Sequence, residues 1–252
     1  RAVRGVINGA VGIVVALALI PIGYLLVRAS QKPFSETISL LIRPKTFDVL
    51  ATTSALVISV VLATVVIGVA IATGLHFVRL PIRRLLLIPT VLPLAIPSYV
   101  FTYTWIALVP EFSGFLAASF ILSITTLPYV ILATLSGLRT VDGSQIEVAR
   151  SLGLTPVQIF RRVVFPQIKG HISAGALLAA LYTISDFGAV SLLNVETLTV
   201  TIQNMYRASY ERSAAAVISF VLIAFSTIVV LADEQVKQQN PDKGLVKVYS
   251  HK

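Results

Sequence analysis

The stretch IEVARSLGLTPVQIFRRVVFP, residues 146–166, interrupts a chain that is otherwise strongly apolar. On both sides of Gly153, apolar residues recur at helical spacing with charged residues between them. Gly153 is placed to end the first helix in the left-handed conformation, which glycine adopts without steric strain. The stretch therefore predicts two short helices joined by a glycine turn, each too short to cross a membrane.

Two capping sequences predict where these helices begin. Ser144 and Glu147 fit the S-x-x-E capping box, in which each side chain accepts from the other residue's backbone amide. Residues 155–158 (TPVQ) fit a second box, with proline at the first helical position. Pro166 is expected to end the second helix or to bend it into the next apolar segment.

Short helices of this kind are marginally stable alone and need a surface to pack on. One interpretation is an amphipathic loop that lies on the bilayer or caps a helical bundle. The other is a docking element for a cytosolic protein. The residues by themselves leave both interpretations open.

The composition predicts a polytopic membrane protein. The chain has 252 residues, of which 56% are hydrophobic and 12% charged, and its mean hydropathy is +0.89, whereas soluble domains carry about 25% charged residues. It has no cysteine, which excludes disulfides and thiolate metal sites. The net charge of +9 comes from basic residues spread between apolar runs, so no nucleic-acid partner is predicted.

Six segments are apolar and long enough to span a bilayer, which predicts an all-α bundle embedded in membrane lipid. They lie near residues 6–27, 49–75, 85–108, 112–136, 172–193 and 213–232. Most of the 20 basic residues then fall on one side, which places the N-terminus and the loop 142–166 in the cytoplasm. The polar stretch 233–252 is expected to be a tail or linker.

The third segment contains three prolines at intervals of four residues, Pro89, Pro93 and Pro97, which would share one face of a continuous helix. Proline frees backbone carbonyls that neighbouring helices or water must satisfy. One hypothesis is a bent helix that lines a substrate path, with Pro93, Pro97 and Tyr99 as candidate residues. The alternative is that the prolines are tolerated kinks.

Asp186 is the acidic residue placed well inside an apolar segment, where a carboxylate indicates either a function or a buried partner. Tyr182 lies one helical turn earlier, and both oxygens are hard ligands of the type that suits Fe³⁺. Tyr182 and Asp186 are therefore candidates for the substrate path. Alternatively, Asp186 binds a backbone amide at a helix break beside Gly188.

The spacing within residues 146–166 resembles the EAA loop of permease subunits in binding-protein-dependent ABC importers. Glu147, Ala149, Gly153 and Pro166 match that pattern, whereas Val148, Val163 and Phe165 are apolar departures. The stretches LPLAIPSYVFTYTW and SDFGAVSLL also resemble ferric-iron importer permeases, especially the amino-terminal half of the fused type. The single EAA loop then corresponds to one of two halves, and the second half is expected to be fused or supplied by a homodimer.

This resemblance implies the partners and the residues that contact them. The loop would dock on a cytosolic ABC ATPase dimer, which binds ATP and Mg. The residues implied in this coupling are Glu147, Ala149, Gly153, Phe160 and Pro166. A periplasmic or extracellular binding protein would deliver the substrate, with the outer loop 194–212 as its candidate contact. The chain itself is not expected to bind a cofactor or a resident metal.

The chain lacks a phosphate-binding G-x-x-x-x-G-K-[ST] loop, so we predict a transport subunit of the bacterial inner membrane that is not an enzyme. Within the same fold the substrate could be thiamine, a polyamine or a phosphonate in place of ferric iron. Two other classes stay open at this stage. One is an ion-coupled secondary transporter, and the other is a membrane-anchored scaffold that transports nothing.

Overall fold

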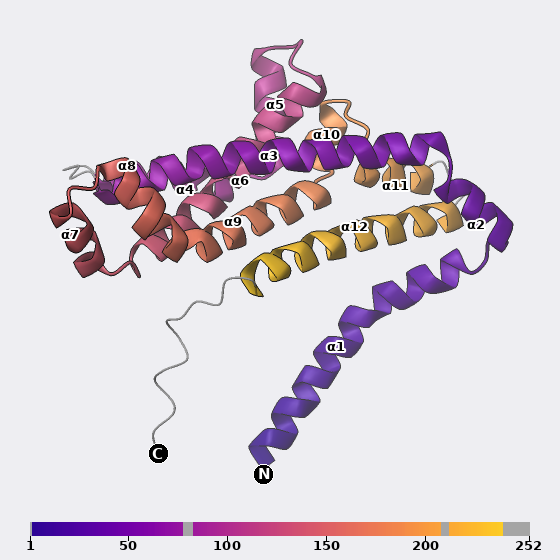
Figure 1. Cartoon of the computed structure of the whole chain (residues 1–252). Coiled ribbons are helices and arrows are strands. Elements are labelled where there is room, and N and C mark those ends of the chain that lie inside the picture. The colour runs from indigo at the N-terminus through magenta and orange to yellow at the C-terminus, as the bar shows by residue number, and fades with distance from the viewer. Residues whose placement is uncertain (1, 78–82, 208–211, 239–252) are drawn as a thin grey trace. The chain divides into compact units, whose positions relative to one another are not determined.

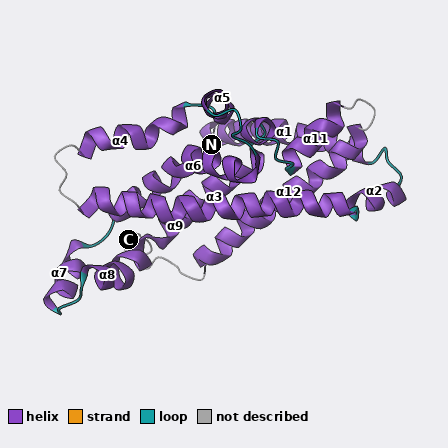
Figure 2. Ribbon diagram, turned by 90° about the horizontal axis from the view of Figure 1, so that it is seen from above, coloured by secondary structure: helices purple, strands orange, loops and turns teal. Residues whose placement is uncertain are grey.

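In the computed structural model the described residues are 2–77, 83–207 and 212–238, and they form helices without any strand. This confirms the all-α prediction. Figures 1 and 2 show the helices. In chain order they are α1 (Ala2–Ala29), α2 (Phe34–Leu41), α3 (Pro44–Phe77), α4 (Arg83–Val91), η1 (Leu92–Ala95), α5 (Ser98–Leu108), α6 (Gly114–Leu138), α7 (Gly143–Ser151), α8 (Pro156–Ile159), the π-helical turn η2 (Phe160–Val164), α9 (Phe165–Ser185), α10 (Gly188–Leu192), α11 (Leu198–Arg207) and α12 (Arg212–Gln238).

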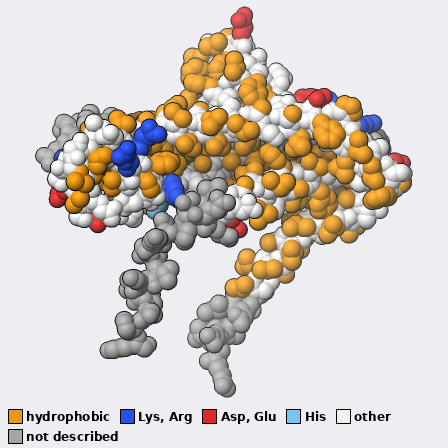
Figure 3. All heavy atoms as spheres, viewed as in Figure 1, with side chains coloured by type: hydrophobic (Ala, Val, Ile, Leu, Met, Phe, Trp, Pro, Cys, Tyr) orange, Lys and Arg blue, Asp and Glu red, His pale blue; other side chains and the backbone are white. Residues whose placement is uncertain are grey.

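The described helices include four that are long and apolar enough to cross a membrane, and up to five if the bent pair α4–η1 and α5 counts as one span. The four are Val11–Ala29, Pro44–Phe77, Gly114–Leu138 and Arg212–Gln235. Hydrophobic side chains cover much of the surface visible in Figure 3, as a lipid-facing surface requires. The predicted segment 172–193 is not among them, because polar residues at the start of α9 lower its hydropathy and the helix ends at Ser185.

The predicted segment 85–108 is not one continuous helix. Its two parts, Leu87–Ala95 and Ser98–Leu108, are bent by 102°. Pro89 lies inside α4, Pro93 is the second residue of the 3-10 turn η1, and Pro97 precedes α5. Proline disfavours the helical conformation of the residue before it, and Ile96 is accordingly extended. The three prolines therefore do not share one helix face, which corrects that prediction.

Three further boundaries differ from the predictions. Residues 172–193 divide into α9 and α10, because the backbone of Asp186 is extended. Pro166 neither ends nor interrupts the second short helix, since it lies in the first turn of α9, where a proline needs no hydrogen-bonded amide. The predicted tail starts inside a helix, because α12 continues to Gln238, and residues 239–252 lie outside the described part.

The chain divides into two compact units. The first comprises residues 1–53 and 196–225, and its core is formed by Val49, Leu198 and Ile218. Thr53 Oγ1 accepts a hydrogen bond of 3.0 Å from the Leu198 amide, and Lys45 forms an exposed ion pair with Glu196 at 3.1 Å. These contacts join the start of α3 to the helix α11, which the sequence did not predict.

The second unit comprises residues 54–195 and 226–252, and it contains both candidate sites. Its central contact is between α6 and α9, which approach closely at Gly175. A Cβ atom at Gly175 would lie 2.8 Å from Val130 Cα and 3.0 Å from the Tyr129 carbonyl oxygen. At Gly137 a Cβ atom would lie 2.8 Å from the His171 ring. Small residues thus allow the two backbones to pack without intervening side chains.

We predict that Gly175→Ala destabilises the fold, because the added methyl group meets backbone atoms that cannot rotate away. The expected loss is about 1–3 kcal/mol, typical of overpacking, and a lower midpoint of thermal unfolding in detergent would show it. The control is Gly74→Ala in α3, where a Cβ atom meets nothing within 4 Å. An unchanged midpoint for Gly175→Ala, or an equal loss for both variants, would contradict the close packing.

Candidate functional site

The loop 142–166 begins with a cap that the sequence prediction misplaced. Helix α7 starts at Gly143, and Asp142 is its N-cap, accepting a hydrogen bond of 2.9 Å from the Ser144 amide. The predicted box of Ser144 and Glu147 is therefore wrong, since Ser144 already lies in the first helical turn. A hydrogen bond from the Ser144 side chain, and to a smaller extent one from its backbone amide, holds the pKa of the exposed Asp142 carboxyl group below its usual range.

The turn and the second cap agree with the sequence prediction. Gly153 has φ +78°, the left-handed conformation expected of it. The Leu154 amide donates a hydrogen bond of 3.2 Å to the Ala149 carbonyl, which satisfies a carbonyl group at the end of α7. Thr155 and Gln158 form the predicted capping box, with reciprocal bonds of 2.9 and 3.4 Å.

One face of the loop packs on the end of the second unit. Ala149 and Ile159 are buried in the same hydrophobic cluster as Leu135, Leu138 and Ile168 of α6 and α9. This burial fixes α7 and α8 against the long helices. Figure 2 shows both short helices at the end of α9. The bundle-capping interpretation is correct for this face of the loop.

Three other apolar side chains of the loop are exposed. The side chains of Val148, Leu152 and Val157 are 59%, 75% and 68% exposed. We call these three residues the loop patch. Exposed apolar side chains on a short polar element make it a candidate interaction surface.

The predicted coupling residues differ in how they are placed. Glu147, Gly153 and Pro166 are exposed, and Glu147 lies on α7 beside the loop patch. Ala149 is buried, and Phe160 is half-buried with its ring 6.3 Å from that of Phe165. Sequence reasoning missed the loop patch, although the helical spacing of its residues around Gly153 was the available signal.

A π-helical turn joins the loop to the membrane helix without a break. The turn η2 follows α8 directly, and α9 follows η2, so the backbone stays helical from Pro156 to Ser185. π-helical turns inside helices are frequently found at functional sites. A continuous helical backbone therefore connects the loop to α9.

The second candidate site lies at the other end of α9, where Asp186 is buried between two helix breaks. Its Oδ1 accepts from the amides of Ala189 (3.0 Å) and Val190 (3.4 Å), which caps α10. Its Oδ2 accepts from Ser98 Oγ at 2.5 Å, at the first residue of α5. The hypothesis that Asp186 binds backbone amides beside Gly188 is confirmed.

The other path candidates differ in their exposure and in their neighbours. Tyr99 is exposed, yet its Cβ atom lies 2.8 Å from where a Gly188 Cβ would be. The Tyr182 ring lies 6.1 Å from the Tyr129 ring of α6. Pro93 is half-buried and Pro97 is exposed at the break before α5. Their proposed contact with substrate stays a prediction.

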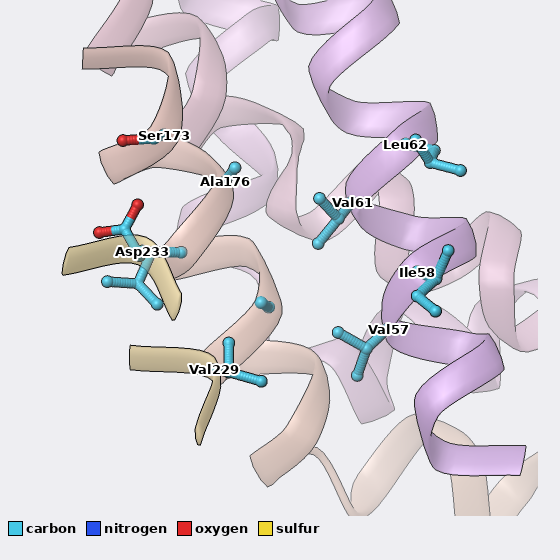
Figure 4. A pocket seen from close by; sticks show the side chains of 10 residues that line it. Val57, Ile58, Val61, Leu62, Ser173, Ala176, Val229 and Asp233 are labelled. Atoms are coloured by element: carbon cyan, nitrogen blue, oxygen red, sulfur yellow. The ribbon is translucent and has the colours of Figure 1, made fainter. Parts of the chain in front are cut away.

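A groove in the second unit lies between α3, α9 and α12 (Figure 4). Its volume is about 300 Å³, and apolar side chains such as Val61, Ala176 and Val229 line it. Ser173 and Asp233 supply the polar groups, and none of the predicted path residues lines it. Such a lining suits an apolar chain better than a metal ion. Within the described residues no group of three or more His, Asp and Glu side chains is placed to hold a metal.

The family described as "Binding-protein-dependent transport system inner membrane component" matches residues 65–239, more than half of the chain. The chain belongs to this family. It is a multi-pass membrane permease subunit, and such subunits lack an ATPase site of their own.

Among curated relatives, the Fe(3+)-transport system permease protein FbpB 2 of Haemophilus influenzae is 32% identical over 214 residues. The match covers 85% of this chain and 42% of that protein, so the chain spans less than half of its length. The probable sulfate transport system permease protein cysT of Nephroselmis olivacea is 26% identical over 88% of the chain and 85% of its own length.

Solved structures show the same fold. A chain of a bacterial ABC transporter for the acidic polysaccharide alginate aligns with a TM-score of 0.73 at 14% identity, covering 93% of this chain and 95% of that one. A chain of the MetNI methionine ABC transporter aligns with a TM-score of 0.68 at 16% identity, covering 77% of this chain and 94% of that one. These identities establish the fold of the permease subunit alone.

We predict that Gly153→Ala loosens the loop, because a left-handed conformation costs a residue with a side chain about 1–2 kcal/mol. Amide exchange of residues 142–158, followed by mass spectrometry, should accelerate by a factor of about 5–30. Gly143→Ala is the control, since a Cβ atom there meets nothing within 4 Å. Equal exchange in wild type and Gly153→Ala would show that the turn does not depend on glycine.

Proposed function

We propose that this chain is the permease component of an ATP-driven importer and couples to a cytosolic ABC ATPase dimer through residues 144–165. The single observation that carries the proposal is the two-faced loop at the EAA position. Ala149 and Ile159 are buried against α6 and α9, whereas the loop patch is exposed. Family membership supports the transport role.

The chemistry of the loop fits insertion into a groove on the ATPase. The loop patch supplies apolar area, and Glu147 beside it supplies a charge that can pair with a basic group of the partner. Gly153 shapes the tip, while Ala149 and Phe160 hold the loop to its own bundle. The partner would bind ATP and Mg and undergo ATP-driven closure, since this chain has no phosphate-binding loop of its own.

We assign ferric iron as the substrate, delivered by an extracytoplasmic binding protein. The support is the match to FbpB 2, whose name states Fe(3+) transport. Sulfate and 2-aminoethylphosphonate permeases match more weakly, at 26% and 29% identity, and they name the competing substrates. Helix α11, which contains part of the predicted contact loop 194–212, would face the binding protein, and a second permease half would complete the path.

The N-terminus lies in the cytoplasm in this proposal, because that orientation puts the loop patch on the ATPase side. An ion-coupled secondary transporter receives less support. Its expected mobile carboxylate would be Asp186, but both oxygens of that residue are already engaged at helix ends.

The docking assignment predicts that Glu147→Arg weakens the complex with the ATPase by at least about tenfold, which corresponds to ~1.4 kcal/mol. The measurement is the affinity of the purified ATPase for the permease in nanodiscs. Glu111→Arg is the matched control, since Glu111 is also exposed but lies at the opposite end of α6. Wild-type affinity in the Glu147→Arg variant would show that the loop is not part of the interface with the ATPase.

The substrate assignment predicts uptake of ⁵⁵Fe³⁺ by proteoliposomes that contain the permease, its ATPase and its binding protein. Uptake should require ATP and should not follow a proton gradient. Labelled sulfate and 2-aminoethylphosphonate serve as competing substrates in the same vesicles. ATP-dependent uptake of either compound without iron uptake would show that this compound is the substrate in place of ferric iron. The proposed function as an ATP-driven importer would then still hold.

A further inference from the structure

We propose that Ser98 and Asp186 form a positioning pair that ties α5 to the end of α9, so that movement of the coupling loop reaches the broken segment α4–η1–α5. The inference rests on the proposed function and deepens it, because it names residues through which coupling would act. Neither residue needs to touch the substrate for this role.

The pair joins two helix breaks that are far apart in the sequence. One break precedes α5, after Pro97, and the other follows α9, at Asp186. A helix end within a membrane leaves backbone amides and carbonyls that must find partners. Asp186 meets this need at α10, where one oxygen accepts from two backbone amides, and its other oxygen binds the side-chain hydroxyl of the first residue of α5.

The surroundings make this joint tight. Ser98 and Asp186 are 6% and 8% exposed, so water has little access to compete for the hydrogen bond. Gly188 lets the backbone of α10 approach Tyr99, because a Cβ atom there would lie 2.8 Å from Tyr99 Cβ. The hydrogen bond at Ser98 and the close contact at Tyr99 therefore hold α5 against α10 at two adjacent residues of α5.

Helix α9 connects this joint to the coupling loop. Its 21 residues extend over roughly 32 Å at 1.5 Å per residue. It continues without a break from η2, and its close contact with α6 at Gly175 supports it along the way. A shift of the loop would therefore move Asp186, and Asp186 would draw Ser98 and α5 with it.

The moved helix carries Tyr99, one of the candidate path residues. Tyr99 and Tyr103 are one turn apart on α5, and their side chains are 55% and 68% exposed. The far end of α5 is held separately, where Trp105 stacks on Phe112 and meets Phe120 of α6. Loss of the Ser98 bond would therefore let the start of α5 pivot about an anchored end.

Three variants separate the tie from the helix cap. Ser98→Ala removes the bond to α5 and leaves both amide bonds of Asp186 to α10 in place. Asp186→Ala removes the tie and the cap together. Ser191→Ala is the matched control, because its hydroxyl group bonds only within α10, to the Gly188 carbonyl.

The first measurement is the distance between spin labels at Tyr103→Cys on α5 and Leu178→Cys on α9, in nanodiscs. Both positions are exposed, and the natural chain has no cysteine to interfere. A single narrow distribution is expected without further change and in Ser191→Ala. Ser98→Ala should broaden it or add a second distance. An unchanged distribution in Ser98→Ala would overturn the proposal.

The second measurement is the number of Fe³⁺ ions imported per ATP hydrolysed in the reconstituted transporter. Ser98→Ala should lower this ratio at least about threefold while ATP hydrolysis stays near the wild-type rate. A variant that is merely less stable would lose both rates together, and that result would contradict the tie. If Asp186→Ala does not accumulate, the comparison of Ser98→Ala with Ser191→Ala tests the tie by itself.

Absence of ATP-driven transport in the wild type would instead contradict the proposed function, and the distance measurement would still test the tie.

Discussion

The contact of α6 with α9 at Gly175 is the constraint on which the second unit depends. No side chain separates the two backbones there, since even a Cβ atom would meet Val130 Cα at 2.8 Å. Association of helices in lipid relies on such close approach, because there is no hydrophobic gain from leaving a solvent that is itself apolar. The contact sets the position of α9, and α9 carries a candidate site at each end.

At the cytoplasmic end proposed here, one short element has to satisfy two surfaces. Ala149 and Ile159 are buried in the chain's own core, while Val148, Leu152 and Val157 are exposed. The buried residues hold the loop against α6 and α9, which is what the proposed transmission of movement to α9 requires. The exposed face offers apolar area to a partner. The buried residues of the loop thus serve packing, and their exposed neighbours serve the proposed docking.

At the other end, a broken helix in the membrane creates a requirement that Asp186 fulfils. The amides of α10 and the hydroxyl group of Ser98 converge on its two oxygens. A buried carboxyl group is stable there because it is hydrogen-bonded on both sides. The apolar groove between α3, α9 and α12 lies on the same helix and takes no part in this arrangement.

Much of this architecture could be predicted from local patterns. The hydropathy indicated the long helices, and Gly153 and the box of Thr155 and Gln158 indicated the turn, because these signals depend on neighbouring residues only. The cap at Asp142 was missed because the S-x-x-E pattern favoured Ser144, although aspartate two residues earlier is an equally preferred N-cap residue. The tie of Ser98 to Asp186 joins residues 88 positions apart, and no local pattern reports such a pairing.

The central claim is that the coupling loop, α9 and the start of α5 move as one body. It is tested most directly by spin labels at Arg150→Cys on α7 and Tyr103→Cys on α5, both exposed, in the transporter assembled with its ATPase. We predict the same narrow distance distribution with ATP bound and without nucleotide. A distance that changes between these two states would show that the loop moves independently of α5.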